Sequence, residues 1–114
     1  MPYIATKTTA AISARKEQML KERMGEAITL IPGKTEDWLM LSYEGNASMY
    51  FKGNADEPCA ICHVMLYGSA TEQDYTALTE RLTDILYEEL EIPTDRVYVT
   101  YSEIDTWGWN GGNL

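Results

Sequence analysis

The same order of predicted elements (strand, helix, strand) occurs twice along the chain, and this repeat restricts the fold more than any other feature. Asp37 and Asp95 each stand just before an apolar, strand-like segment. The interval between them equals the interval between Tyr43 and Tyr101, which lie within those segments. The repeat predicts an α/β (α+β) fold with a four-stranded sheet and two helices on one face. The predicted domain is a single unit, 1–114, with pseudo-repeat halves of about 1–57 and 58–114.

Short runs rich in apolar, β-branched and aromatic residues predict the strands. They are 3–8, 38–43 and a short 48–52 in the first half, and 60–67 and 96–101 in the second. The segment 53–58, Gly-Asn-Ala-Asp-Glu-Pro, is rich in turn residues and is the best candidate for the link between the halves.

Apolar residues at helical spacing follow the first strand of each half. In the first helix, which Ser13 can cap and Pro32-Gly33 ends, they are Leu20, Met24, Ala27, Ile28 and Ile31. In the second, which Pro93 ends, they are Tyr75, Leu78, Leu82, Ile85, Leu86 and Leu90. Thr71 with Asp74 three residues later resembles a capping box at the start of the second helix.

Two helices with one apolar stripe each can cover only one face of the sheet. The other face carries Ile4, Leu39, Leu41 and Val64, or the residues that alternate with them. With no further helix available, another subunit is the natural cover, so we expect an oligomer.

The charge balance excludes several classes of partner. Nine Lys and Arg against eighteen Asp and Glu give a net charge of −9, which repels nucleic acids and anionic membrane surfaces. No run approaches the ~20 apolar residues of a membrane span, and the first residues lack the pattern of a secretory signal. Two cysteines and one histidine are too few for a structural zinc site, so we expect no metal.

Pro2 is a candidate general base. Aminopeptidases remove Met1 when the next residue is small, and removal exposes a secondary amine at the start of a predicted strand. The reference pKa of an α-amine, about 7.7–8.0, lies far below that of lysine. Burial and a nearby cation would lower it further, towards a base that is neutral near pH 7. The alternative is that Pro2 is simply a stiff second residue.

Several motifs together resemble the macrophage migration inhibitory factor family over the whole chain. They are Met1-Pro2, Gly33-Lys34, the run 57–62 (EPCAIC), the run 93–101 (PTDRVYVTY) and the run 107–111 (WGWNG). The resemblance implies a ferredoxin-like double βαβ fold assembled as a homotrimer around a central channel. It also implies keto–enol tautomerisation of aromatic 2-oxo acids such as phenylpyruvate, and of dopachrome derivatives, without a cofactor.

The same resemblance implies roles for individual residues. Pro2 matches the catalytic proline, and Lys34 matches the lysine that pairs with the substrate carboxylate. The backbone amide of Tyr67 matches one that helps to hold the substrate. Tyr98 matches an aromatic residue that the neighbouring subunit contributes, and Trp109 matches a tryptophan of the pocket wall.

The chain departs from the family pattern at three positions. Tyr67 replaces a common aliphatic residue, which puts the pocket width in question. Thr100 stands where several members carry Asn, and a hydroxyl donates one proton where an amide donates two. Leu114 replaces the usual terminal aromatic residue. Without the resemblance, Lys34 would be an ordinary solvated lysine and Tyr98 a tyrosine at the edge of the core.

The Cys59-Ala60-Ile61-Cys62 segment is the pattern of a thiol oxidoreductase, but its predicted setting argues against that function. A redox CxxC opens a helix, whose N-terminus stabilises the first thiolate. Here the pair enters a strand, where residues three apart point to opposite faces. We interpret both cysteines as structural and assign no role to His63.

Two further hypotheses stand beside the tautomerase. One is a cytokine-like signalling or interaction protein that binds a protein receptor. The other is hydration or dehalogenation of an unsaturated acid by the N-terminal proline, which in this fold uses more cations than Lys34 alone. Every reaction of Pro2 as a base requires the loss of Met1, since the nitrogen is otherwise an amide. The expected location is cytoplasmic, or secreted without a signal peptide.

Overall fold

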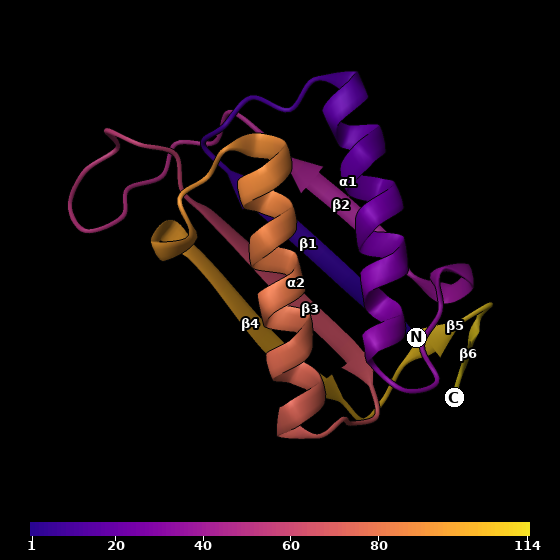
Figure 1. Cartoon of the computed structure of the whole chain (residues 1–114). Helices are drawn as coiled ribbons and strands as arrows, with labels where there is room; N and C mark the ends of the chain where they lie inside the picture. Colours follow the sequence, from indigo (N-terminus) through magenta and orange to yellow (C-terminus); the bar gives the residue numbers. More distant parts are fainter.

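A computed structural model describes all residues, 1–114 (Figure 1). Its main elements are β1 (Pro2–Thr8), α1 (Ala14–Ala27), β2 (Met40–Glu44), β3 (Ala60–Tyr67), α2 (Glu72–Leu90) and β4 (Val97–Ile104). A small hairpin of β5 (Gly108–Trp109) and β6 (Gly112–Asn113) follows, and three 3-10 turns complete the chain: η1 (Ile28–Leu30), η2 (Glu36–Trp38) and η3 (Thr94–Arg96).

The four long strands form one mixed sheet in the order β2-β1-β3-β4. β1 pairs with β2 and β3 pairs with β4 in parallel, whereas β1 and β3 are antiparallel. Both helices lie side by side on one face of this sheet (Figure 1). The predicted fold class, two βαβ units in a four-stranded sheet, is confirmed. The interval from the start of β1 to the start of β3 equals that from the start of α1 to the start of α2.

The two predicted helix caps are present. The Ser13 hydroxyl accepts a hydrogen bond from the amide of Lys16. Thr71 and Asp74 form a full capping box, in which each side chain accepts from the backbone amide of the other. These bonds satisfy amides that a helix N-terminus otherwise leaves without partners.

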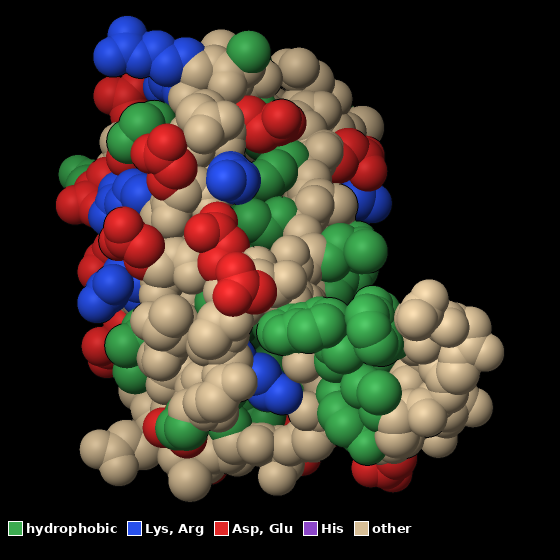
Figure 2. All heavy atoms as spheres, turned by 90° about the vertical axis from the view of Figure 1, so that its right-hand side faces the viewer, with side chains coloured by type: hydrophobic (Ala, Val, Ile, Leu, Met, Phe, Trp, Pro, Cys, Tyr) green, Lys and Arg blue, Asp and Glu red, His purple; other side chains and the backbone are tan.

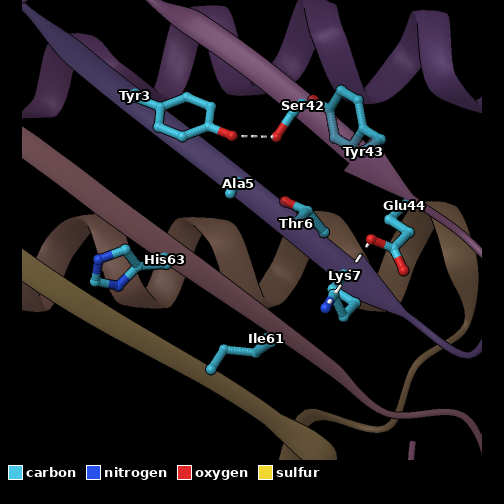
Figure 3. Close-up of a pocket in the computed structure, with 9 residues that line it drawn as sticks. All are labelled: Tyr3, Ala5, Thr6, Lys7, Ser42, Tyr43, Glu44, Ile61 and His63. Atoms are coloured by element: carbon cyan, nitrogen blue, oxygen red, sulfur yellow. Dashed lines mark hydrogen bonds and ion pairs between the residues drawn. The ribbon is translucent and has the colours of Figure 1, made fainter. Parts of the chain in front are cut away.

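Alternation along the strands separates a core face from an open face. Ile4, Cys62 and Val64 are fully buried beneath the helices, together with the apolar stripes of α1 and α2. Leu39 and Leu41 also pack on this side. The face without helices therefore carries the alternate residues, among them Tyr3, Ala5, Ile61, His63 and Met65. Figure 3 looks onto this open face, with the helices behind the sheet.

Residues 48–52 do not form the expected strand. They end in a two-residue turn at Lys52 and Gly53, with φ of 53° and 79°, closed by one isolated bridge between Phe51 and Asn54. The strand expected at 38 begins only at Met40, because 36–38 forms the turn η2. Neither helix has the length and apolar character needed to span a bilayer.

Candidate active site

A largely apolar cleft of about 630 Å³ opens where β1 begins, beside the C-terminal hairpin. Its walls are Met1, Pro2, Tyr3, Asp37, Trp38, Leu39, Met40, Met65, Trp107, Gly108 and Trp109. Figure 2, which views the molecule from the side of the hairpin, shows hydrophobic side chains gathered there. Clefts of this size and composition are typical of sites for small molecules.

Pro2 is buried in this cleft because β1 is a central strand that starts at the second residue. Its neighbour across the sheet is Leu66 of β3. The carbonyl of Met1 accepts a hydrogen bond of 3.0 Å from the Tyr67 amide, which fixes the end of the chain against β3. Met1, Pro2 and the backbone of Tyr67 are thus brought together.

Lys34 reaches the same place from the loop after α1. Gly33 has φ of 80°, a conformation that glycine adopts readily, and the Lys34 ammonium donates a hydrogen bond of 2.9 Å to the Tyr67 carbonyl. Burial, followed by the positive charge of Lys34, lowers the pKa of the Met1 amine from 8.0 to about 6. The environment therefore favours a neutral amine at the chain end near pH 7.

Two tryptophans form one wall of the cleft. Trp109 of β5 packs edge to face on Trp38, with ring centroids 5.2 Å apart at 84°. Of these lining residues, the sequence predicts Trp109 but not Trp38, Met40, Met65 and Trp107. The sequence predicts that Trp38 starts a strand. No local pattern indicates that η2 places this residue at the cleft.

Tyr98 and Thr100 do not lie at this cleft within one chain. Pro2 is level with Leu66, which pairs with Glu103, well beyond Tyr98 on β4. At ~3.3 Å per residue this separates Tyr98 from the level of Pro2 by roughly 17 Å along the strands. Tyr98 is 58% exposed.

His63 is held by two hydroxyl side chains of β4 on the open face. Its Nδ1 hydrogen-bonds to Thr100 Oγ1, and its Nε2 lies 3.1 Å from Ser102 Oγ. A second hollow of about 370 Å³ lies on this face between Tyr3, Ser42, Glu44 and His63 (Figure 3). Its polar pairs are Tyr3 with Ser42, at 2.7 Å between hydroxyl oxygens, and Lys7 with Glu44.

The cysteines occupy structural positions. Cys59 and Cys62 are both free and buried. Burial raises the pKa of the Cys62 thiol to about 11, although a hydrogen bond with the Thr6 hydroxyl opposes this shift. A protonated, buried thiol is a poor nucleophile. No group of three or more His, Cys, Asp or Glu side chains is arranged to hold a metal ion.

The sheet consists of two βαβ units, and β1, one of its two central strands, starts with a proline in an apolar cleft. This combination is characteristic of the class of tautomerase-fold proteins. The sequence profile described as "Macrophage migration inhibitory factor (MIF)" matches residues 1–114, and the chain belongs to this family.

Relatives with known names and structures agree with this assignment. Macrophage migration inhibitory factor of Xenopus laevis is 26% identical over 116 residues, which cover 100% of this chain and 99% of the relative. The crystal structure of Leishmania major MIF2 has a TM-score of 0.92 at 27% identity, covering 100% of this chain and 97% of that one. The homologue from Prochlorococcus marinus has a TM-score of 0.88 at 26% identity, covering 97% of both chains.

Proposed function

We propose that this protein is a cofactor-independent keto–enol tautomerase of phenylpyruvate-like aromatic 2-oxo acids, with dopachrome-type compounds as further substrates. The observation that carries the proposal is the environment of the chain end, where burial and Lys34 lower the pKa of the Met1 amine to about 6. When Met1 is removed, the Pro2 amine becomes the chain end beside the same buried surface and Lys34, and we expect these two causes to lower its pKa as well. An amine with a lowered pKa is available as a neutral base near pH 7.

The proton transfer needs one group that both accepts and donates. From the keto form, the Pro2 nitrogen takes a proton from the carbon next to the carbonyl and returns it to the carbonyl oxygen. From the enol form, it takes the hydroxyl proton and delivers it to that carbon. The substrate gains and loses one proton in either direction, so the step needs no oxidant or reductant.

Loss of Met1 would also free groups that can hold the substrate. The Tyr67 amide now donates to the Met1 carbonyl, and without Met1 it can donate to a substrate oxygen. The Lys34 ammonium, which lies beside the Tyr67 carbonyl, can pair with the carboxylate. Trp38 and Trp109 offer aromatic surfaces to the ring of the substrate.

We propose that the active form is a homotrimer in which Tyr98 and Thr100 act in the cleft of a neighbouring subunit. Their place on β4, far along the strands from Pro2, and the sheet face without helices both support this arrangement. In such a site the Tyr98 ring would stack on the substrate and its hydroxyl would bind a substrate oxygen.

The assembly predicts a mass in solution. Sedimentation equilibrium at micromolar concentration should give three times the 12.9 kDa of one chain, because no helix covers the open face, which exposes large side chains such as Met40 and Tyr98. The ion pair of Lys7 and Glu44 on the same face forms within one chain and is exposed. Exposed pairs of this kind contribute little free energy, so moderate salt, which screens them, should leave the mass unchanged. A mass equal to that of a single chain at this concentration would contradict the trimer.

The direct test of the function is the enol-to-keto rate of phenylpyruvate on protein whose intact mass shows that Met1 is absent. A rate above background that acylation of the Pro2 nitrogen abolishes would support the proposal. No rate above background would contradict it and favour the second hypothesis, an interaction protein with a vestigial site, which the cytokine-like name of the family suggests.

A further inference from the structure

Arg96 is a buried cation that no carboxylate neutralises. Only 7% of its surface is exposed, and its guanidinium donates four hydrogen bonds, all to backbone carbonyls. The acceptors are Phe51 (3.2 Å), Asn54 (3.1 Å), Glu57 (3.1 Å) and Pro58 (3.2 Å). A buried guanidinium requires this kind of full hydrogen bonding, so its position in the fold is tightly fixed.

The four acceptors belong to one loop that curls around the guanidinium. The turn at Lys52 and Gly53 brings Phe51 and Asn54 into a pair of backbone hydrogen bonds, of 3.0 and 3.2 Å. The carbonyls of these two residues then point to Arg96, together with those at the end of the loop. The Phe51 ring also lies 5.4 Å from the guanidinium carbon, within range of a cation–π contact. Arg96 therefore contacts both the backbone and the ring of Phe51.

Phe51 in turn supports Tyr98. The two rings meet edge to face, with centroids 5.1 Å apart at 80°. Tyr98 is 58% exposed and makes no side-chain hydrogen bond within the chain, and Phe51 is the one aromatic ring that its own ring packs against. An aromatic pair of this geometry contributes about 0.5–1.5 kcal/mol beyond burial of its surface.

We infer that Arg96 is a positioning residue that, through Phe51, holds Tyr98 in the orientation required at the cleft of the neighbouring subunit. The inference rests on the proposed function, since it gives Tyr98 a substrate to contact. Arg96 itself touches no substrate. Its contribution is to fix a loop in which the carbonyls of Glu57 and Pro58 would, without the guanidinium, lose their donor.

The test compares Arg96→Lys and Phe51→Leu with wild-type protein. A lysine keeps the charge but has three donors for four carbonyls and no planar fork. Phe51→Leu leaves the loop backbone in place and removes only the ring. Thr8→Val is the matched control, because it removes a buried hydrogen bond to the nearby Cys59 carbonyl and touches neither Phe51 nor Arg96.

Two readouts are measured on each protein. The first is the NMR signal of the Tyr98 ring in protein with ¹³C-labelled tyrosine, assigned with Tyr98→Phe. The second is the steady-state kinetics of phenylpyruvate tautomerisation on protein without Met1. We expect both variants to shift the Tyr98 signal and to raise KM about three- to tenfold with kcat within about twofold, as loss of a binding contact does. Thr8→Val should change neither readout, even where it lowers the melting temperature as much as Arg96→Lys does.

The outcomes separate this inference from the proposed function. An unmoved Tyr98 signal in Arg96→Lys would overturn the inference whatever the rates are. A moved signal with an unchanged KM, in a wild-type protein that is active, would also overturn it. If the variants shift the Tyr98 signal but the wild-type protein has no tautomerase activity, the proposed function is overturned. The shift would then still support the inference that Arg96 positions Tyr98.

Discussion

Pro2→Gly, in protein that has lost Met1, should lower kcat/KM for phenylpyruvate by about a hundredfold or more, within the range that a positioned acid–base group contributes. Glycine keeps an α-amine at the end of the chain but loses the ring. The ring prevents rotation about the N–Cα bond and so fixes the direction of the nitrogen lone pair, whereas a glycine amine can rotate away. The measurement is the steady-state rate with the intact mass of each protein verified.

A matched control for this variant is the wild-type sequence with Met1 retained. It differs from the mature protein by one residue and has the fold described above, but its Pro2 nitrogen is an amide and cannot act as a base. We expect no rate above background from this form. A Pro2→Gly protein with the full wild-type rate, or a Met1-retaining protein that is active, would show that Pro2 is not the base.

Lys34→Ala should have two effects of different kinds. The first is a KM for phenylpyruvate raised by about 10- to 100-fold, because a hydrogen bond to a charged group contributes about 1.5–3 kcal/mol. The second is a change in the pH profile. Lys34 is the second cause, after burial, of the low pKa of the Met1 amine. We expect its charge to act in the same direction on the Pro2 amine, so its removal should raise the pKa of that amine. The amine must be neutral to act as a base, so the acidic limb of kcat/KM should move to higher pH.

Two variants serve as controls for Lys34→Ala. Lys16→Ala removes an exposed lysine near the start of α1, whose ammonium donates only to the Glu89 carbonyl, and it should change neither KM nor the pH profile. Lys34→Arg keeps the charge and should restore most of the shift in the acidic limb, even where its different geometry leaves KM raised. An unchanged acidic limb in Lys34→Ala would show that Lys34 does not tune the base.

Much of the fold could be predicted because its signals are local. The caps at Ser13 and Thr71 and the apolar stripes of both helices depend on residues within a few turns of each other. The equal spacing of matching residues in the two halves then fixes the order of the two βαβ units. The open face of the sheet also follows, because two one-sided helices cannot cover both faces.

The failures of prediction have a common cause in long-range contacts. The segment 48–52 has strand-like composition, but the carbonyls of Phe51 and Asn54 bind the guanidinium of Arg96, which belongs to the other half of the chain. Trp38 leaves the sheet because η2 turns it towards Trp109, close to the C-terminus. Neither partner can be identified from the local sequence. The roles of Pro2, Lys34 and Tyr98 came from the family resemblance, since residue type alone left ordinary structural alternatives open.

The central position of β1 has a consequence for the order of events during synthesis. β1 is synthesised before both strands that flank it, one of which ends at Glu44 and the other at Tyr67. β1 is therefore unpaired until β2 has emerged, and its other edge stays open until more than half of the chain has emerged. During that interval the N-terminus is accessible to an aminopeptidase. Once β3 is in place, the Tyr67 amide holds the Met1 carbonyl, so an aminopeptidase and the folded sheet would compete for this residue.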